Sequence, residues 1–206
     1  AAAAVATTPY YWTPPAGMLL EHFTRIGRAA GIPFFVYNSP QEMGGVKVTT
    51  DLVCKLLDRL DNFMGVIDAS LDWQFMIEVI SSARESRPGF QLLTGSEYMI
   101  SAGAIGAVGM FAPLAGIAPK AVRLLWERCR GQAYDAARPI QEAIAALRQA
   151  VKPWGVAGLK GGMQVMQRGC GPPRPPLDPL GAEDMEKIAA AIDAIPLLHG
   201  EPRGWQ

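Results

Sequence analysis

The stretch Gly31–Pro40, reading GIPFFVYNSP, decides the fold of this chain. Its apolar run, Ile32–Val36, is followed by the turn residues Asn38–Pro40. A short apolar run bounded by turn residues is typical of a strand buried on both faces of a parallel sheet. Tyr37 ends the run, at the edge where α/β folds assemble their ligand sites. Tyr37 is therefore the first candidate for chemistry; the plainer interpretation is a strand-end tyrosine with its ring in the core and its hydroxyl in a hydrogen bond.

The same pattern recurs at intervals of about thirty residues: Val66 follows Val36 by 30 positions, and Leu93 follows Val66 by 27. Segments with apolar residues at helical spacing lie between the runs, and Thr49 or Thr50 is the expected N-cap of one of them. A βα unit of this length predicts a parallel sheet with right-handed crossover helices. The expected strands are Ala1–Thr8, Pro33–Tyr37, Phe63–Ile67, Phe90–Leu93 and Ala107–Met110.

Beyond Pro113 the pattern changes to helices. They are expected at Ala118–Arg130, Ala133–Ala150, Val156–Arg168 and Ala182–Ile195, with the Pro-rich GCGPPRPPLDPL as an extended connector before the last of them. The domain organisation predicted from this change is a partial (β/α) barrel over residues 1–131 and a C-terminal helical extension over residues 132–206.

Composition excludes several classes of protein. Half of the 206 residues are hydrophobic and 18% are charged, which is typical of a globular domain. Lys plus Arg and Asp plus Glu both total 19, so no net field favours nucleic acid or an anionic membrane as partner. The opening AAAAVATTPYY has no basic segment and is too short to span a bilayer, so we expect neither a signal peptide nor an anchor.

Cysteine usage favours a reducing compartment. Cys54, Cys129 and Cys170 are odd in number, far apart and without CxxC spacing, so neither disulfides nor a zinc site are indicated. The spacing of Gly103, Gly106 and Gly109 does not match a dinucleotide fingerprint. We therefore expect a cytoplasmic protein without a metal or other cofactor.

Six motifs follow one another in an order that resembles a known family. They are TPYY at Thr8–Tyr11, YNSP at Tyr37–Pro40, GVIDAS at Gly65–Ser70, LLTGSE at Leu92–Glu97, GAIGAVG at Gly103–Gly109, and GPPRPPLDPL near the C-terminus. The chain resembles the dihydrodipicolinate synthase and N-acetylneuraminate lyase family over nearly its whole length. The resemblance implies an α/β fold, a TIM (β/α)8 barrel with three additional C-terminal helices, usually in tetramers built from tight dimers. It also implies cleavage or condensation of 2-oxo acids through a lysine Schiff base.

The resemblance covers only strands four to eight of such a barrel. We expect either an N-terminal portion that precedes this sequence, carrying the threonine pair with which the family binds the pyruvate carboxylate, or a half-barrel that must associate; we favour the first. Five strands cannot close a barrel, so the chain as given would leave two open edges and an apolar face that recruits a partner or aggregates.

The Schiff-base lysine of the family is replaced. In the aligned GVIDAS, Ile67 stands where the amine should be, and a Schiff base requires an amine. Lys47, Lys55 and Lys160 fall in loop or helix segments, so a rescue by one of them would need another site geometry. We expect Schiff-base chemistry to be absent.

The residues after YNSP depart as well. Glu42 occupies the position of the family's carboxylate-binding arginine, which removes a bidentate clamp for an anion and adds repulsion. Asp68 is a candidate acid or base at the rim, the alternative being a loop aspartate that caps the following helix.

By resemblance, two tyrosines survive as candidate catalytic residues. Tyr37 matches the tyrosine that protonates or deprotonates substrate, and Tyr11 matches the one that reaches into the neighbouring site across the tight-dimer interface; packing alone is the alternative for each. Gly95 and Val108 match positions that line the pocket through backbone groups, although small-residue packing also explains them. The candidate substrate-binding residues are Gly95, Val108, Ile67 and Asp68.

Two functional hypotheses follow. The chain is an enzyme of the lyase and aldolase family with altered chemistry, acting by proton transfer on a small-molecule 2-oxo acid or related carbonyl compound. Alternatively, it is a catalytically inactive binding or assembly protein on the same fold. In both cases the exposed aromatic cluster Tyr10–Trp12 favours a homo-oligomer, a dimer or a tetramer.

Overall fold

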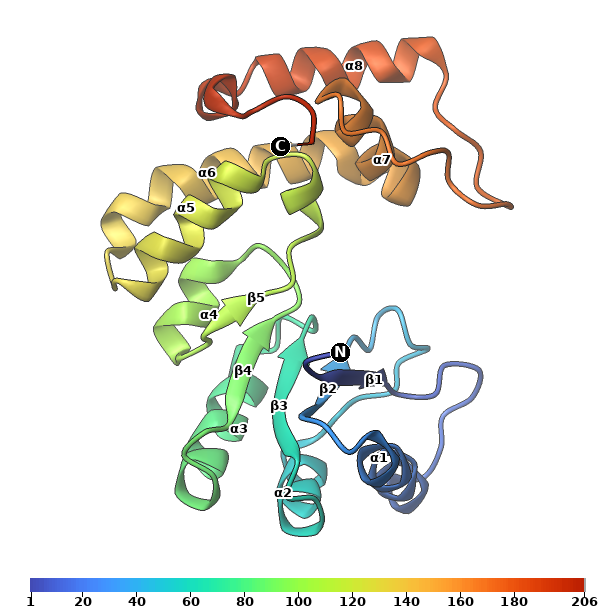
Figure 1. The fold of residues 1–206 in the computed structure, drawn as a ribbon, viewed down its shortest axis with the longest axis vertical. Coiled ribbons are helices and arrows are strands. Elements are labelled where there is room, and N and C mark those ends of the chain that lie inside the picture. The colour runs from blue at the N-terminus through green and yellow to red at the C-terminus, as the bar shows by residue number, and fades with distance from the viewer. Residues whose placement is uncertain (206) are drawn as a thin grey trace. The chain divides into compact units, whose positions relative to one another are not determined.

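The computed structural model describes residues 1–205 of the chain. The chain divides into two compact units, Ala1–Phe111 and Ala112–Gln206. Figure 1 shows their elements along the ribbon. Within the described residues, the first unit holds the strands and the second is built of helices. The division into a barrel part over 1–131 and an extension over 132–206 remains a prediction.

The first unit alternates strands and helices. Its elements are β1 (Ala4–Thr7), α1 (Ala16–Ala30), β2 (Phe34–Asn38), α2 (Thr50–Arg59), β3 (Phe63–Asp68), α3 (Trp73–Ser86), β4 (Gln91–Thr94), α4 (Met99–Ile105) and β5 (Gly109–Met110). The five predicted strands are confirmed, with ends that differ by at most three residues. Thr49 is the N-cap of α2, since its hydroxyl accepts the Leu52 amide at 3.2 Å.

The strands form one parallel sheet in the order β1-β2-β3-β4-β5, as predicted. Tyr37 pairs with Thr7 on one side and with Ile67 on the other, and Ile67 pairs in turn with Leu93. Partners in this register point to the same face, because side chains alternate along a strand. We call this surface the Tyr37 face.

The opposite surface, the helix face, carries the hydrophobic core of the first unit. Figure 1 shows α1, α2 and α3 on one side of the sheet, and their apolar side chains form a single cluster with strand residues such as Val36, Val66 and Leu92. A row of phenylalanine rings crosses this core, from Phe23 on α1 through Phe34 and Phe63 to Phe90, which directly precedes β4, at centroid distances of 6.5, 6.1 and 5.6 Å. Each fully buried ring contributes about 1.5–3 kcal/mol. The helix face therefore holds this unit together.

The second unit is helical, as predicted. It contains η1 (Pro113–Gly116), α5 (Pro119–Arg130), α6 (Tyr134–Val151), η2 (Lys152–Trp154), α7 (Gly155–Val165), α8 (Ala182–Asp193) and η3 (Pro196–Gly200). Its C-terminal segment is fixed by two ionic side chains. The buried Arg168 donates to the carbonyl oxygens of Ile117 at 2.7 Å and Gly204 at 2.9 Å, and Glu201 accepts the Lys120 amide at 3.1 Å at the start of α5.

Candidate functional site

The carboxyl edge of the sheet brings Tyr37 and Ile67 together. They are direct partners between β2 and β3, so their side chains lie next to each other on the Tyr37 face. Tyr37 is half-buried, and Ile67 is only 1% exposed although it lies outside the core cluster of the helix face. The candidate tyrosine is thus a neighbour of the position where the resemblance expects an amine.

Tyr37 is held as a neutral phenol. Burial is the largest cause that raises the pKa of Tyr37, the Glu42 and Asp68 carboxylates raise it further, and a hydrogen bond with Ser39 acts in the opposite direction. A phenol with a raised pKa keeps its proton, so it is a hydrogen-bond donor and by itself a poor base. Such a donor is suited to polarise the oxygen of a carbonyl group.

The two lysines of the first unit lie elsewhere. Lys47 lines a cavity between its own loop and α3, and Lys55 pairs with Asp51 at 2.7 Å on the exposed side of α2. Lys160, in the second unit, donates to the carbonyl oxygens of Cys170 and Gly171. Neither lysine of the first unit is therefore a sheet partner of Tyr37, whose partners are Thr7 and Ile67.

Asp68 follows Ile67 but lies on the helix face, fully buried. Its carboxylate accepts Asn38 Nδ2 at 2.6 Å and Ser70 Oγ at 2.9 Å, and Asn38 Oδ1 in turn accepts the Val48 amide at 3.0 Å. Burial raises the pKa of Asp68, and the hydrogen bonds from Asn38 and Ser70 act to lower it. The alternative that Asp68 caps α3 is wrong, because Asp72 is the N-cap and accepts the Phe75 amide at 3.1 Å.

Gly95 directly follows β4, whereas Val108 directly precedes β5 and so lies at the amino end of that strand. The Gly95 amide donates to the Asp68 carbonyl at 2.6 Å, and a Cβ at Gly95 would stand 2.5 Å from the Cβ of Ala69. Close packing against Ala69 thus requires glycine there, whether or not it also lines a pocket. Val108 is 52% exposed, and its amide donates to the Leu92 carbonyl at 2.9 Å.

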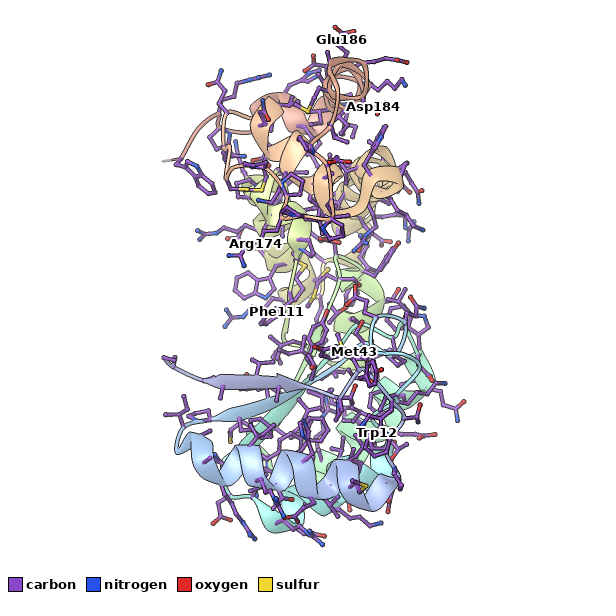
Figure 2. All side chains as sticks on the ribbon, turned by 90° about the vertical axis from the view of Figure 1, so that its right-hand side faces the viewer. Trp12, Met43, Phe111, Arg174, Asp184 and Glu186 are labelled. Atoms are coloured by element: carbon purple, nitrogen blue, oxygen red, sulfur yellow. The ribbon has the colours of Figure 1, made fainter. Side chains whose placement is uncertain are left out.

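Tyr11 is not brought to Tyr37 within the described chain. Tyr10, Tyr11 and Trp12 are 73%, 94% and 52% exposed, on the loop that joins β1 to α1. This loop runs beside the β2–α2 loop, where the Tyr10 carbonyl oxygen lies 3.1 Å from the point at which a Gly44 Cβ would stand. Figure 2 shows Trp12 and Met43 on these two loops. The aromatic loop is therefore a surface next to the candidate site.

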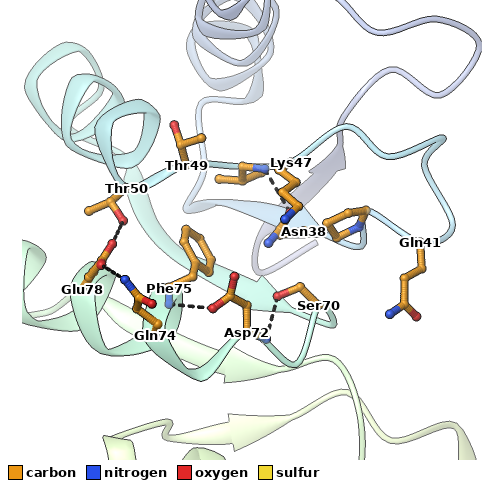
Figure 3. A pocket seen from close by; sticks show the side chains of 12 residues that line it. Asn38, Gln41, Lys47, Thr49, Thr50, Ser70, Asp72, Gln74, Phe75 and Glu78 are labelled. Atoms are coloured by element: carbon orange, nitrogen blue, oxygen red, sulfur yellow. Dashed lines mark hydrogen bonds between the residues drawn. The ribbon is translucent and has the colours of Figure 1, made fainter.

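A sizeable cavity lies outside the Tyr37 face. Its volume is about 420 Å³, and Figure 3 shows it between the β2–α2 loop and the start of α3, with a polar lining that includes Lys47, Ser70 and Glu78. Glu78 accepts Thr50 Oγ1 at 3.1 Å and Gln74 Nε2 at 2.9 Å. Since Tyr37 and Ile67 do not line it, this cavity is distinct from the candidate site.

The described chain has neither a cluster of metal-ligating side chains nor a helix suited to span a membrane. Among residues 1–205, no group of three or more His, Cys, Asp or Glu side chains is placed to hold a metal ion. The cysteines are free, with Cys54 half-buried, Cys129 buried and Cys170 exposed. In the same part of the chain, no helix is both long and apolar enough to cross a bilayer.

Two residues of the site were missed in the sequence. The sequence predicts Asn38 and Ser39 only as turn residues, but they are 2% and 3% exposed, and they donate hydrogen bonds to Asp68 and Glu42 respectively. The available signal was their position directly after the strand, since polar residues at the carboxyl ends of parallel strands commonly face a site.

A model described as the dihydrodipicolinate synthetase family matches residues 1–195. An uncharacterised DapA-like lyase of Halobacterium salinarum is 28% identical over 94% of this chain and 62% of its own length. A 4-hydroxy-tetrahydrodipicolinate synthase of Rhodopseudomonas palustris is 32% identical over 96% of this chain and 66% of its own length. The chain thus spans about three fifths to two thirds of the length of these relatives.

Solved structures give the same result for the fold. Dihydrodipicolinate synthase from Thermotoga maritima is 22% identical, with a TM-score of 0.87 over 96% of this chain and 68% of that one. The enzyme from Acinetobacter baumannii, solved with pyruvate, is 25% identical, with a TM-score of 0.85 over 96% and 67%. The prediction of a TIM-barrel-family fold, of which these five strands form part, is confirmed.

Proposed function

Because the chain belongs to the dihydrodipicolinate synthetase family, we propose that it binds a small 2-oxo acid or related carbonyl compound at the Tyr37 face and acts on it as a lyase without forming a Schiff base. The reaction class comes from the family, and the departure from it comes from this chain's own residues. Proton transfer at the carbonyl compound, with Tyr37 as hydrogen-bond donor, is the chemistry these residues support best.

The observation that carries this proposal is Ile67. It is the partner of Tyr37 in the sheet, and by the resemblance of the GVIDAS motif we place it where the family has its lysine. An aliphatic side chain has no electron pair to attack a carbonyl carbon, so the covalent route is closed at this position. The carbonyl compound would then be activated only through hydrogen bonds and charge.

Reductive trapping tests the absence of the Schiff base. The chain is treated with pyruvate and borohydride, and its mass is measured, with Ile67→Lys as the matched variant that restores an amine beside Tyr37. We expect no adduct on the wild-type chain and an adduct at position 67 in Ile67→Lys. A pyruvate adduct on any lysine of the wild-type chain would overturn the proposal.

The second candidate function is binding without catalysis. It is favoured by Glu42, which stands where the family has a carboxylate-binding arginine, and by the exposed position of Tyr11. Thermal shifts with pyruvate and with hydroxyacetone separate the two: a ligand shift that is unchanged in Tyr37→Phe, with no turnover in either protein, favours the binding protein.

We also propose a homo-oligomer and a cytoplasmic location. The loop Tyr10–Trp12 exposes three aromatic rings, which are costly to solvate unless a partner covers them. Three free cysteines are consistent with a reducing compartment. Light scattering of the wild-type chain and of Tyr11→Ala tests the oligomer, since the variant should dissociate at a higher protein concentration than the wild type.

A further inference from the structure

Lys160 and Cys170 meet in the second unit, where the connector between α7 and α8 begins. Lys160 lies on α7 and is half-buried, and Cys170 is exposed in the extended segment that Figure 1 shows leading from α7 to α8. The Lys160 Nζ lies 3.5 Å from the Cys170 Sγ. The second unit therefore places an amine beside a free thiol.

The backbone of the connector holds the lysine in this position. Its Nζ also donates to the carbonyl oxygens of Cys170 at 3.4 Å and of Gly171 at 3.2 Å. An ammonium group has three protons, and these three contacts match them in number. Because all three acceptors belong to two consecutive residues, they keep the nitrogen beside the sulfur, and such proximity raises the rate of a reaction between the two groups.

The pair lies in a pocket with room for a small reactant. The pocket has a volume of about 250 Å³, and Lys160 and Cys170 line it together with connector residues such as Pro172. The Met163 Sδ lies 3.9 Å from the Cys170 Sγ, so a second oxidisable sulfur is close by. Oxidation of a cysteine requires access to its sulfur, and the exposure of Cys170 gives that access to a molecule as small as hydrogen peroxide.

We propose that hydrogen peroxide converts this pair into a reversible sulfenamide cross-link between Lys160 and Cys170, a modification site that is independent of the proposed lyase chemistry. The Cys170 sulfur first takes one oxygen from the peroxide: an S–O bond forms, the O–O bond breaks, and the thiol becomes a sulfenic acid as water leaves. Lys160, having released one proton to solvent, then attacks that sulfur as a free amine. An N–S bond forms, the S–O bond breaks, and the departing hydroxide takes a proton from the nitrogen and leaves as water.

Atoms and electrons balance over the two steps. One thiol, one amine and one peroxide molecule give one N–S bond and two molecules of water. The sulfur loses two electrons, and the peroxide takes them up. A thiol reductant returns the two electrons and restores the thiol and the amine, so the cross-link is reversible.

The cross-link would join the connector covalently to α7. In the reduced chain, the connector is attached at this point by the hydrogen bonds of Lys160 to Cys170 and Gly171. In the oxidised chain, an N–S bond adds to them across ten positions of the sequence. The attachment of the connector to the helix then depends on the redox state of the surroundings.

A purely structural role for Lys160 is the competing explanation, because its hydrogen bonds to the connector carbonyls need no chemistry. Lys160→Arg separates the two. A guanidinium group also donates to carbonyl oxygens, but it stays protonated and has no free electron pair with which to attack sulfur. Cys54→Ser, which removes a half-buried thiol on α2, is the matched control.

The test treats the full chain with hydrogen peroxide, blocks the free thiols, digests the protein with trypsin and maps the peptides by mass spectrometry. In the wild type we expect the peptide 149–168, uncleaved after Lys160, to be joined to the peptide 169–187, with a mass two hydrogens below their sum. Dithiothreitol before digestion should separate them again. Lys160→Arg and Cys170→Ser should give no joined pair, and Cys54→Ser should match the wild type.

A 1,3-dione that traps sulfenic acids gives a second readout. It should label Cys170 more strongly in Lys160→Arg than in the wild type, because the sulfenic acid then has no amine with which to condense. Equal labelling in the two proteins, a joined pair that retains an added oxygen, or oxidation confined to Met163 as its sulfoxide would each overturn the proposal. None of these results bears on the proposed function, because the residues of the Tyr37 face take no part in the cross-link.

Discussion

Two consecutive residues of β3, Ile67 and Asp68, point to opposite faces of the sheet. On the helix face, Asp68 is fully buried and receives hydrogen bonds from Asn38 and Ser70. On the Tyr37 face, Ile67 is an aliphatic partner of Tyr37, at the position where we propose that a reactive amine has been replaced. The difference separates a buried polar network that holds the strand ends together from the face on which we propose that the chemistry has changed.

The largest expected effect on stability comes from removing the buried hydrogen bonds of Asn38 on the helix face. Asn38→Ala removes the donor to Asp68 and leaves the Val48 amide without its acceptor, all in a buried site. Unsatisfied buried polar groups of this kind cost about 2–4 kcal/mol in the free energy of unfolding. Urea denaturation measures the loss.

The matched control is Gln74→Ala, which removes an exposed amide–carboxylate hydrogen bond to Glu78. Exposed contacts contribute little, so we expect a change below about 0.5 kcal/mol. Equal losses of unfolding free energy in the two variants would mean that the buried Asn38–Asp68 hydrogen bond contributes no more to stability than an exposed one.

The next prediction concerns the strand ends that meet beside Asp68. Gly95→Ala would place a Cβ 2.5 Å from the Cβ of Ala69 and 3.0 Å from its Cα, so the backbone of one loop must move. Such overpacking costs about 1–3 kcal/mol. In Gly89→Ala, the nearest atom to the new Cβ is the Met64 terminal methyl at 3.6 Å, and we expect no loss. If Gly95→Ala and Gly89→Ala are equally stable in thermal denaturation, close packing does not explain the glycine at position 95.

The sequence predicted the helix face better than the Tyr37 face, for a physical reason. Apolar runs such as Ile32–Val36 and turn residues such as Thr49 report local preferences, and these placed the strands and the cap of α2. The roles of Ser39 and Asp68 depend on which side chains the sheet brings together, for example the pairing of Asn38 with Asp68 thirty residues later.

The cap of α3 illustrates the same limit. The sequence prediction named only Asp68 as a possible cap, whereas β3 extends to Asp68 and Asp72, four residues later, caps the helix. In the second unit, Arg168 read as a helix residue, but its guanidinium binds carbonyl groups far along the chain, which no local pattern reports.

A smaller effect is expected in the pH dependence of stability. Burial raises the folded-state pKa of Asp68 above its unfolded value, so its protonated form is favoured in the folded chain. The stability from this group is fully present below the unfolded pKa, about 3.9, and is lost as pH rises through the folded pKa. Asp68→Asn keeps an acceptor for Asn38 but cannot ionise.

We therefore expect Asp68→Asn to gain stability relative to the wild type as pH rises across that window, by about 1.4 kcal/mol for each unit of the pKa difference. Asp51→Asn, which changes an exposed carboxylate on α2, is the control. Urea midpoints between acidic and neutral pH measure both. A wild type that instead gains on Asp68→Asn over this range would show that the hydrogen bonds outweigh burial.

The smallest change in stability is expected for Tyr37→Phe, and this variant gives the clearest test of the difference between the helix face and the Tyr37 face. Tyr37→Phe removes one hydroxyl from a half-buried ring and leaves the ring's packing against Ile67, so the free energy of unfolding should change by less than about 1 kcal/mol. Binding or exchange of a carbonyl compound should nevertheless fall by about a hundredfold, because that hydroxyl is the donor at the site. Asn38→Ala should show the opposite: a large loss in the free energy of unfolding and little change in binding or exchange. Binding and exchange are compared per folded molecule in both variants. If Tyr37→Phe destabilises the chain as much as Asn38→Ala does, the Tyr37 hydroxyl has a structural role. The helix face would then no longer differ from the Tyr37 face in serving stability rather than chemistry.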